Sequence, residues 1–169
     1  DYNAYDNGSQ NIPNEVTNIR MTGGHIHIGW TEGVDPFDFT HFSTCVQLAK
    51  QLDWTLFVPS LFFDKDTIRR NSYGRPGNFR PKPYGIEYRT LSNFWIHTPE
   101  LTEFVFNQTM KAVTDLADKG IDYCQTKGTN FVSSLWNDFL YAHPSEKMYY
   151  YKRGLNKHFR ETGVGVKAK

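Results

Sequence analysis

Two stretches of the chain alternate apolar and polar residues with the period of two that a β-strand requires. The first runs from Asn18 to Trp30 and reads NIRMTGGHIHIGW. Its polar face carries His25, His27 and Gly29, and its apolar face carries Ile26, Ile28 and Trp30. We therefore expect a strand with one buried side and one side that is open to solvent or to a ligand.

The second alternating stretch reads GIEYRTLSNFW. Glu87 and Arg89 share one face of it, and the opposite face carries Ile86, Tyr88 and Thr90. This stretch predicts a second strand of the same kind, again with a polar side and an apolar side.

Three stretches have apolar residues at the 3.6-residue spacing of an amphipathic helix. Asp38 or Thr40 can cap the first of them. The second has Thr98 as its cap, Pro99 in its first turn and Gly120 as its stop. The third is expected to end before Pro144. The apolar stripes are Phe42, Cys45, Val46, Ala49 and Leu52 in the first, Leu101, Phe104, Val105, Ala112, Val113 and Leu116 in the second, and Val132, Leu135, Trp136, Phe139 and Leu140 in the third.

Two segments lack a regular period. Residues 54–63 are apolar around Pro59 and are expected in the core, with no preferred type of element. Residues 71–85 contain three Gly and three Pro, so we expect no regular element there. Strands separated by long helices and loops predict an α+β domain with a small, mostly antiparallel sheet and helices packed on one side of it.

Composition sets the scale of this domain. The chain has 169 residues, of which 16% are aromatic, so it can form a single hydrophobic core and is not expected to be disordered. No apolar run approaches the roughly 18 residues that a membrane span needs. Cys45 and Cys124 lie far apart and outside any CxxC motif, which favours two buried free thiols over a disulfide.

The formal net charge of +1 hides a local excess of positive charge. Residues 67–86 carry five basic and no acidic residues, namely Arg69, Arg70, Arg75, Arg80 and Lys82. One interpretation is a loop that clamps polyphosphate, since arginine matches phosphate oxygens. The alternatives are a solvated loop and a nucleic-acid contact with Phe79 and Tyr84 as stacking partners. The small net charge argues against a protein that wraps nucleic acid along its whole surface.

The polar faces of the two strands carry the candidate chemistry. His25 and His27 project from the same side and could share a metal ion or an anion, or could bind only water. Glu87 offers a carboxylate to a cation and Arg89 offers a guanidinium to phosphate or carboxylate, or the two could form a solvated ion pair. If the two strands are neighbours, all four groups line one face and form a site.

The motifs GGHIHIGW and FRPKPYGIEYRTLSNFW resemble the bacteriophage-encoded carboxylate-amine ligases of type 2, members of the amidoligase superfamily that are similar to glutamine synthetase. The resemblance runs from the opening DYNAY to about residue 110. It implies a glutamine-synthetase-like catalytic fold and an ATP-dependent reaction: a carboxylate becomes an acyl phosphate, and an amine displaces phosphate to give an amide. It also implies Mg²⁺ as a cofactor, and a location in the cytoplasm of the infected bacterial host or on the virion.

Carried to this sequence, the resemblance implies a role for each polar residue. His25 and Glu87 would be ligands of one metal ion. His27 would contact phosphate or the reacting acyl group, and Arg89 would bind the γ-phosphate or the substrate carboxylate, so both are candidate catalytic residues. The candidates for holding the phosphates of ATP are Arg75, Arg80 and Arg89.

One departure from the family pattern concerns the start of the chain. Members of the family begin with further strands that carry acidic metal ligands, and this chain starts after them. We therefore expect residues 1–169 to be a single domain, the C-terminal portion of an amidoligase-like catalytic domain, with the preceding segment as its partner. One alternative is an inactive structural protein that binds other phage proteins. The other is a nucleic-acid-binding module that uses the basic loop and the basic tail from Lys147. The carboxylate and amine substrates are unknown.

Overall fold

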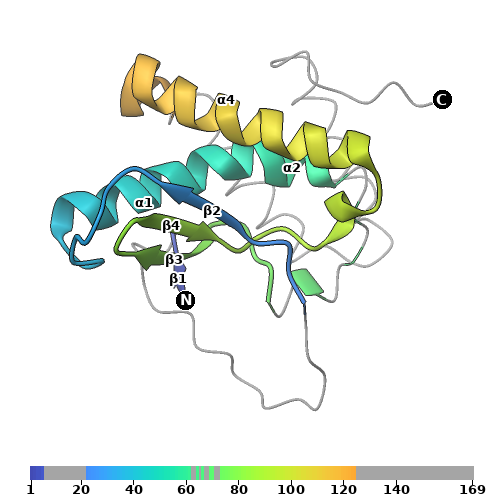
Figure 1. Cartoon of the computed structure of the whole chain (residues 1–169), viewed down its shortest axis with the longest axis horizontal. Coiled ribbons are helices and arrows are strands. Elements are labelled where there is room, and N and C mark those ends of the chain that lie inside the picture. The colour runs from blue at the N-terminus through green and yellow to red at the C-terminus, as the bar shows by residue number, and fades with distance from the viewer. Residues whose placement is uncertain (6–21, 62–63, 65, 67–68, 71–72, 125–169) are drawn as a thin grey trace, which may run out of the picture.

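The computed structural model describes residues 1–5, 22–61, 64, 66, 69–70 and 73–124. Within these residues four strands form one open antiparallel sheet in the order β1-β3-β4-β2, with the helices on one side of it (Figure 1). The predicted α+β class with an antiparallel sheet is thereby confirmed. The strands are β1 at Tyr2–Asn3, β2 at Ile26–Gly29, β3 at Asn78–Lys82 and β4 at Gly85–Tyr88.

The two alternating stretches are neighbours in this sheet. β2 and β4 pair in a register that places His27 opposite Glu87 and Gly29 opposite Gly85. On its other side β4 pairs with β3, where Arg80 lies opposite Glu87. Because these two strands are neighbours, the polar side chains of both alternating stretches lie on one face of the sheet.

β3 contradicts the expectation that residues 71–85 contain no regular element. Gly77, with φ of 79°, turns the chain immediately before the strand. Asn78 O accepts a hydrogen bond of 2.9 Å from the backbone N–H of Arg89, the residue after β4. The backbone N and C=O of Pro81 point away from β4, toward the side of β3 on which β1 pairs. β1 pairs only with Asn78 and Phe79, so it does not reach Pro81. Pro81 thus lies where the sheet needs no N–H donor, which is where a strand tolerates proline.

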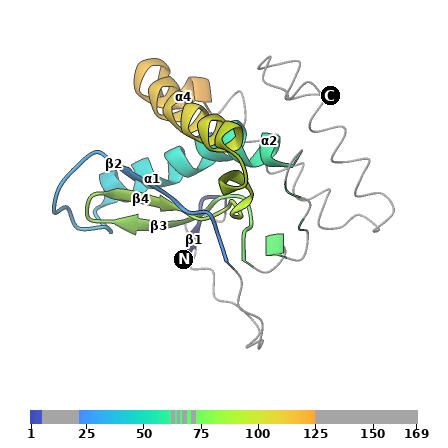
Figure 2. The ribbon, with the colours of Figure 1, turned by 45° about the vertical axis from the view of Figure 1, so that its right-hand side comes forward.

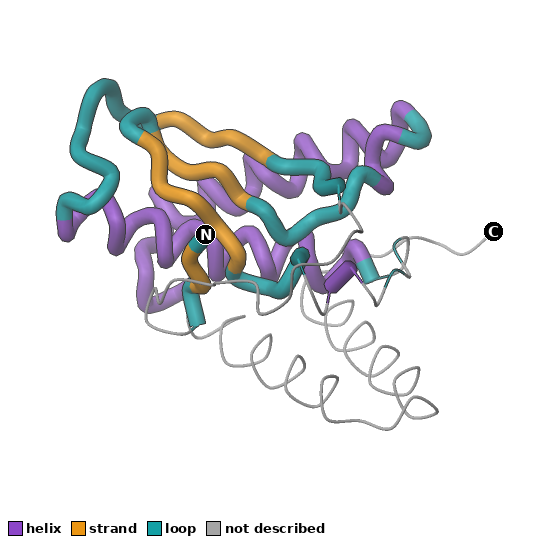
Figure 3. The backbone as a smooth tube through the Cα atoms, turned by 90° about the horizontal axis from the view of Figure 1, so that it is seen from below, coloured by secondary structure: helices purple, strands orange, loops and turns teal. Residues whose placement is uncertain are grey.

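Two long helices cover the apolar face of the sheet. α1 (Phe39–Leu52) lies against β3 and β4, and α4 (Pro99–Cys124) lies on α1 (Figures 1 and 2). Figure 3 shows the strands in front of these helices when the molecule is seen from below. The helices between and beside them are the π-helix η1 at Asp53–Phe57, the short α2 at Val58–Ser60 and the 3-10 helix η2 at Phe94–Ile96.

The helix boundaries follow the predicted caps. Asp38, and not Thr40, caps α1, because its carboxylate accepts a 3.0 Å hydrogen bond from the backbone N–H of His41. At the start of α4 the hydroxyl of Thr98 accepts from the N–H of Leu101 at 3.3 Å. Gly120, with φ of 76°, interrupts α4, but the chain continues as helix to Cys124. The helix predicted around Val132 to Leu140 lies outside the described residues.

The core lies between the apolar face of the sheet and these helices. Cys45 and Cys124 are both buried and free, as predicted. In the part of the chain that the structure describes, no helix has the length and apolar content needed to cross a membrane. The buried apolar side chains that meet in the core include Cys45, Leu48, Ala49 and Leu52 of α1, Phe79, Ile86 and Tyr88 of the sheet, and Val105 and Ala112 of α4.

Candidate functional site

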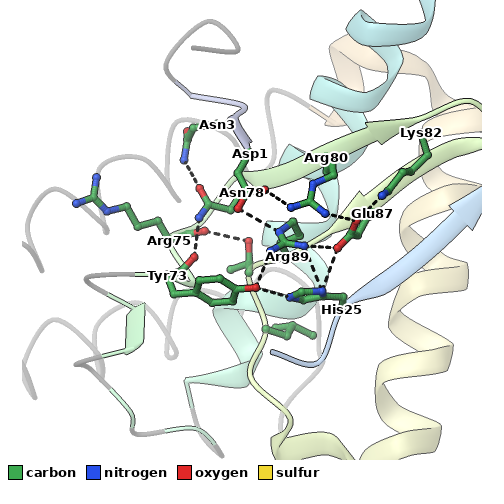
Figure 4. A network of polar contacts seen from close by, with 12 residues as sticks. Asp1, Asn3, His25, Tyr73, Arg75, Asn78, Arg80, Lys82, Glu87 and Arg89 are labelled. Atoms are coloured by element: carbon green, nitrogen blue, oxygen red, sulfur yellow. Dashed lines mark hydrogen bonds and ion pairs between the residues drawn. The ribbon is translucent and has the colours of Figure 1, made fainter. Parts of the chain in front are cut away.

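The face of the sheet that points away from α1 carries polar side chains from three strands. Strand alternation sends Ile86 and Tyr88 into the core, so Glu87 between them must project from the opposite face. The same alternation places the polar residues of β2 and β3 beside it, and Figure 4 shows most of them together with Asp1 and Tyr73. The resulting group, here called the polar sheet face, comprises His25, His27, Arg80, Lys82, Glu87 and Arg89.

Glu87 is the centre of the polar sheet face. Its side chain is only 5% exposed, and Lys82 Nζ lies 3.0 Å and Arg80 Nη1 3.5 Å from its Oε2. Its Oε1 contacts Arg89 Nη1 and lies 3.0 Å from His25 Nδ1. Burial would raise the pKa of Glu87, but its bonds to Lys82 and Arg89 and the charge of Arg80 outweigh this and lower it to about 2. Glu87 is therefore an ionised carboxylate surrounded by cations.

Arg89 links this carboxylate to the rest of the site. Its Nη1 donates to Glu87 and its Nη2 donates to the hydroxyl of Tyr73 at 2.6 Å. Its Nε lies 3.3 Å from the carboxylate of Asp1. The guanidinium is 8% exposed, so its orientation is set by these contacts and not by solvent.

His25 has a partner at each ring nitrogen. Nδ1 faces Glu87, and Nε2 lies 3.2 Å from the hydroxyl of Tyr73. Burial lowers the pKa of His25, the charge of Arg89 lowers it further, and Glu87 opposes this. A neutral ring satisfies the contacts with Glu87 and Tyr73 if Nδ1–H donates to Glu87 and Tyr73 donates to Nε2 while accepting from Arg89.

His27 lies at the exposed end of the polar sheet face. Its ring stacks on Tyr84 with the centroids 6.1 Å apart, and Nδ1 forms a 2.5 Å hydrogen bond with the hydroxyl of that tyrosine. Tyr84 belongs to the tight connection between β3 and β4 and is 38% exposed. His27 is thus next to Glu87 in the register but accessible to a ligand.

The basic residues of 67–86 do not form one loop, which corrects the sequence prediction. Arg80 and Lys82 lie on β3 and point to Glu87. Arg69 is buried and donates to the carbonyl oxygens of Thr22, Thr90 and Leu91 at 2.6–2.9 Å. Arg70 is also buried, 3.3 Å from the carboxylate of Asp64. Arg69 and Arg70 therefore hold the backbone together and are not available to clamp a phosphate.

Arg75 is the one predicted phosphate ligand that the structure places apart from the others. Its side chain is exposed, and Figure 4 shows its guanidinium pointing away from Glu87 and Arg89. Its carbonyl oxygen accepts a 3.0 Å hydrogen bond from the hydroxyl of Thr90. Arg75 thus supports the segment after β4 through its backbone, while Arg80 and Arg89 both contact Glu87.

Two members of the site were not predicted from the sequence. Tyr73 joins Arg89 to His25, and its ring also lies under the guanidinium of Arg89, 5.4 Å away. Asp1 lies beside Arg80 and Arg89 because β1 pairs with β3. Neither residue lies at a strand or helix spacing from the His25/His27 pair or the Glu87/Arg89 pair, so the sequence pattern does not indicate it.

The charges of the site favour an anion. Three cations, from Arg80, Lys82 and Arg89, face the two carboxylates of Asp1 and Glu87. Among these five side chains this leaves an excess of one positive charge. Several cations preorganised on one rigid sheet are suited to phosphate or carboxylate oxygens.

A metal ion would find two converging donors, Glu87 and His25. Among the described residues no group of three or more His, Cys, Asp or Glu side chains could hold a metal. Mg²⁺ commonly binds through one or two carboxylates together with substrate phosphates and water. The described residues therefore offer two ligands at most, Glu87 and His25, and do not form a complete protein cage for a metal ion.

Comparison with known proteins extends the relationship beyond the two motifs. A family model described as "Phage phiEco32-like COOH.NH2 ligase-type 2" matches residues 14–161. The match starts after the opening DYNAY and continues well past residue 110. Searches of curated proteins and of solved structures gave no match. Because the family model covers most of the 169 residues and all but Asp1 of the site described above, the chain belongs to the family of phage phiEco32-like COOH.NH2 ligases of type 2.

Proposed function

We propose that the protein is an ATP-dependent carboxylate-amine ligase with a glutamine-synthetase-like fold, and that the polar sheet face binds the phosphates of ATP. The observation that carries the proposal is the convergence of Arg80, Lys82 and Arg89 around Glu87 in a chain of this family. Cations at fixed positions stabilise the charge that develops on a phosphoryl group during transfer.

The proposed reaction has two steps. A carboxylate oxygen of the substrate attacks the γ-phosphorus, the bond to the bridging oxygen breaks, and ADP leaves. An amine nitrogen then attacks the acyl carbon and loses a proton, and inorganic phosphate leaves with the electrons of the C–O bond. Arg80 and Arg89 would hold the phosphate, and the exposed ring of His27 would contact phosphate or the reacting acyl group. The carboxylate and amine substrates are to be identified.

Magnesium belongs to this proposal as a companion of the nucleotide. Glu87 and His25 are the residues that would hold it, since they converge on one point of the face. When bound, the ion would neutralise phosphate charge and polarise the P–O bonds. Glu87 is suited to this because it stays ionised, its pKa being lowered to about 2. We place the activity in the cytoplasm of the infected host, where ATP is available.

The nucleic-acid alternative has less support from the geometry. It uses a basic loop and the basic tail from Lys147; the tail lies outside the described residues, and in the loop Arg69 and Arg70 are buried against backbone and Asp64. Of the other three basic residues, Arg80 and Lys82 point at the carboxylate of Glu87, and Arg75 is exposed and points away from it. A structural or virion-associated protein that has kept the fold without the activity stays an alternative, and ATP binding separates it from the ligase.

Two exposed arginines provide a matched test. We expect the full-length protein to bind MgATP in isothermal titration calorimetry and Arg80→Met to weaken that binding about tenfold or more, the value of a charge-assisted hydrogen bond. Arg75→Met makes the same chemical change on a side chain that points away, so it should bind as the wild type does. The absence of any MgATP binding by the wild type, or equal weakening by both variants, would refute the proposal.

A further inference from the structure

One carboxylate of the site lies between two arginines. Asp1 Oδ1 is 2.9 Å from Arg80 Nη2, and Asp1 Oδ2 is 3.3 Å from Arg89 Nε (Figure 4). Each oxygen therefore faces a different guanidinium. This is the arrangement by which two arginines hold the oxygens of a single carboxylate or phosphate.

The fit of Asp1 in this position is incomplete. Arg89 Nε is buried and makes no hydrogen bond in the described part of the chain, although Asp1 Oδ2 is near. The other nitrogens of the same guanidinium donate to Glu87 and to Tyr73. A buried donor without an acceptor is costly, so a better placed oxygen would be favoured at this point.

Asp1 is also the more replaceable of the two carboxylates. Glu87 is 5% exposed and contacts four basic side chains, whereas Asp1 is 22% exposed and contacts two. Asp1 directly precedes β1 and is held in the site by these two ion pairs. Arg80 is 44% exposed, so an incoming anion can reach the place that Asp1 occupies.

We propose that the space between Arg80 Nη2 and Arg89 Nε is an oxyanion subsite and that the carboxylate of Asp1 is its displaceable internal occupant. A ligand oxyanion replaces Asp1 there and supplies the hydrogen-bond acceptor that Arg89 Nε lacks. The ligand is an oxyanion of the ligase reaction, either the substrate carboxylate or a phosphate of ATP, and only this identification rests on the proposed function. Because the occupant competes with the ligand, its removal should tighten anion binding.

The test compares Asp1→Ala with wild type in the full-length protein. Inorganic phosphate and acetate, each without magnesium, serve as probes in calorimetric titrations. An occupant that fills the subsite about nine-tenths of the time lowers the apparent affinity about tenfold, so Asp1→Ala should bind one of the probes about ten times more tightly. Tightening for phosphate assigns the subsite to the nucleotide, and tightening for acetate assigns it to the substrate carboxylate.

Two further variants control for charge and for folding. Glu103→Gln removes an exposed carboxylate on α4 and should leave the affinity for both probes unchanged. Adding Arg80→Met to Asp1→Ala should abolish the gain, because one wall of the subsite is lost. Circular dichroism of each variant confirms that the fold is retained.

Several results would overturn the subsite. These are unchanged or weaker binding of both probes by Asp1→Ala, an equal gain in Glu103→Gln, or no binding of either probe by either protein at millimolar concentration. If the gain is found but wild type does not bind MgATP, the subsite stands and the ligase proposal fails. If wild type binds MgATP and Asp1→Ala shows no gain, the ligase proposal stands and the subsite fails.

Discussion

Asp53 is a fully buried carboxylate behind the strand that carries Glu87. It begins the π-helix η1, and its Oδ1 accepts a 2.6 Å hydrogen bond from the hydroxyl of Tyr88. Burial raises the pKa of Asp53 to about 7, although hydrogen bonds from Tyr88 and Thr90 act in the opposite direction. The two carboxylates on either side of β4 are thus shifted in opposite directions, because Glu87 is surrounded by cations and Asp53 by neutral groups.

The raised pKa of Asp53 predicts a pH-dependent stability. Between its unfolded pKa of 3.8 and its folded pKa of about 7, the native protein holds a proton that the unfolded chain releases. Stability should therefore fall as pH rises through this range, by on the order of 4 kcal/mol for this group. Asp53→Asn cannot titrate, so urea unfolding of both proteins between pH 5 and 8 should give a stability difference that changes with pH. A difference that stays constant across this range would contradict the prediction.

Tyr73 shows the limit of sequence analysis at the scale of single residues. The positions of His25, Glu87 and Arg89 follow from strand alternation, and the pairing of β2 with β4 confirms that they share a face. Tyr73 reaches them from a segment rich in Gly and Pro, where side-chain direction depends on tertiary contacts alone. Its role as a bridge between Arg89 and His25 could only be read from the structure.

At the scale of elements, the close approach of β2 and β4 depends on a glycine. Gly85 has φ of 154°, and a Cβ added there would lie 2.0 Å from the backbone oxygen of Ile28. Gly29 is paired with Gly85, and a Cβ added to Gly29 would lie 3.5 Å from its nearest neighbouring atom. The two glycines face each other across the same pair of strands, yet only Gly85 is sterically required.

This contrast predicts unequal effects of the same substitution. Gly85→Ala should lower the free energy of unfolding by about 2 kcal/mol or more, because the strands must separate or the backbone must strain. Gly29→Ala should change it by less than about 1 kcal/mol. Urea unfolding followed by tryptophan fluorescence measures both. Equal stability of the two variants would mean that the β2–β4 contact is not as close as described.

Some helices and strands of the fold can be predicted from the sequence pattern, and β3 cannot. β2, β4, α1 and α4 follow from periodicity and caps, although β4 is buried on both faces and not on its apolar face alone. The sequence does not reveal β3, because Pro81 and the Gly and Pro residues that flank the strand are typical of a loop, whereas the open edge at Pro81 tolerates proline. The basic cluster was misassigned for the same reason, since Arg80 and Lys82 belong to that strand.

At the scale of the whole molecule, charge is concentrated on one side of the sheet. The net charge of the chain is only +1, but the polar sheet face brings Arg80, Lys82 and Arg89 together at one carboxylate. The opposite face is apolar and packs on α1, which keeps the strands in register. A rigid sheet that presents cations on its open face can bind an anion without reorganising, which is the basis of the proposed nucleotide site.

The central claim is that this face binds ATP with magnesium held at Glu87, and its most direct test is ATP titration of the full-length wild type and Glu87→Gln, with and without magnesium. We predict that magnesium tightens ATP binding to the wild type. In Glu87→Gln, ATP alone should bind more tightly because a negative charge among the cations is gone, and the gain from magnesium should fall at least about tenfold. The same magnesium gain in both proteins, or no ATP binding by the wild type, would contradict this account.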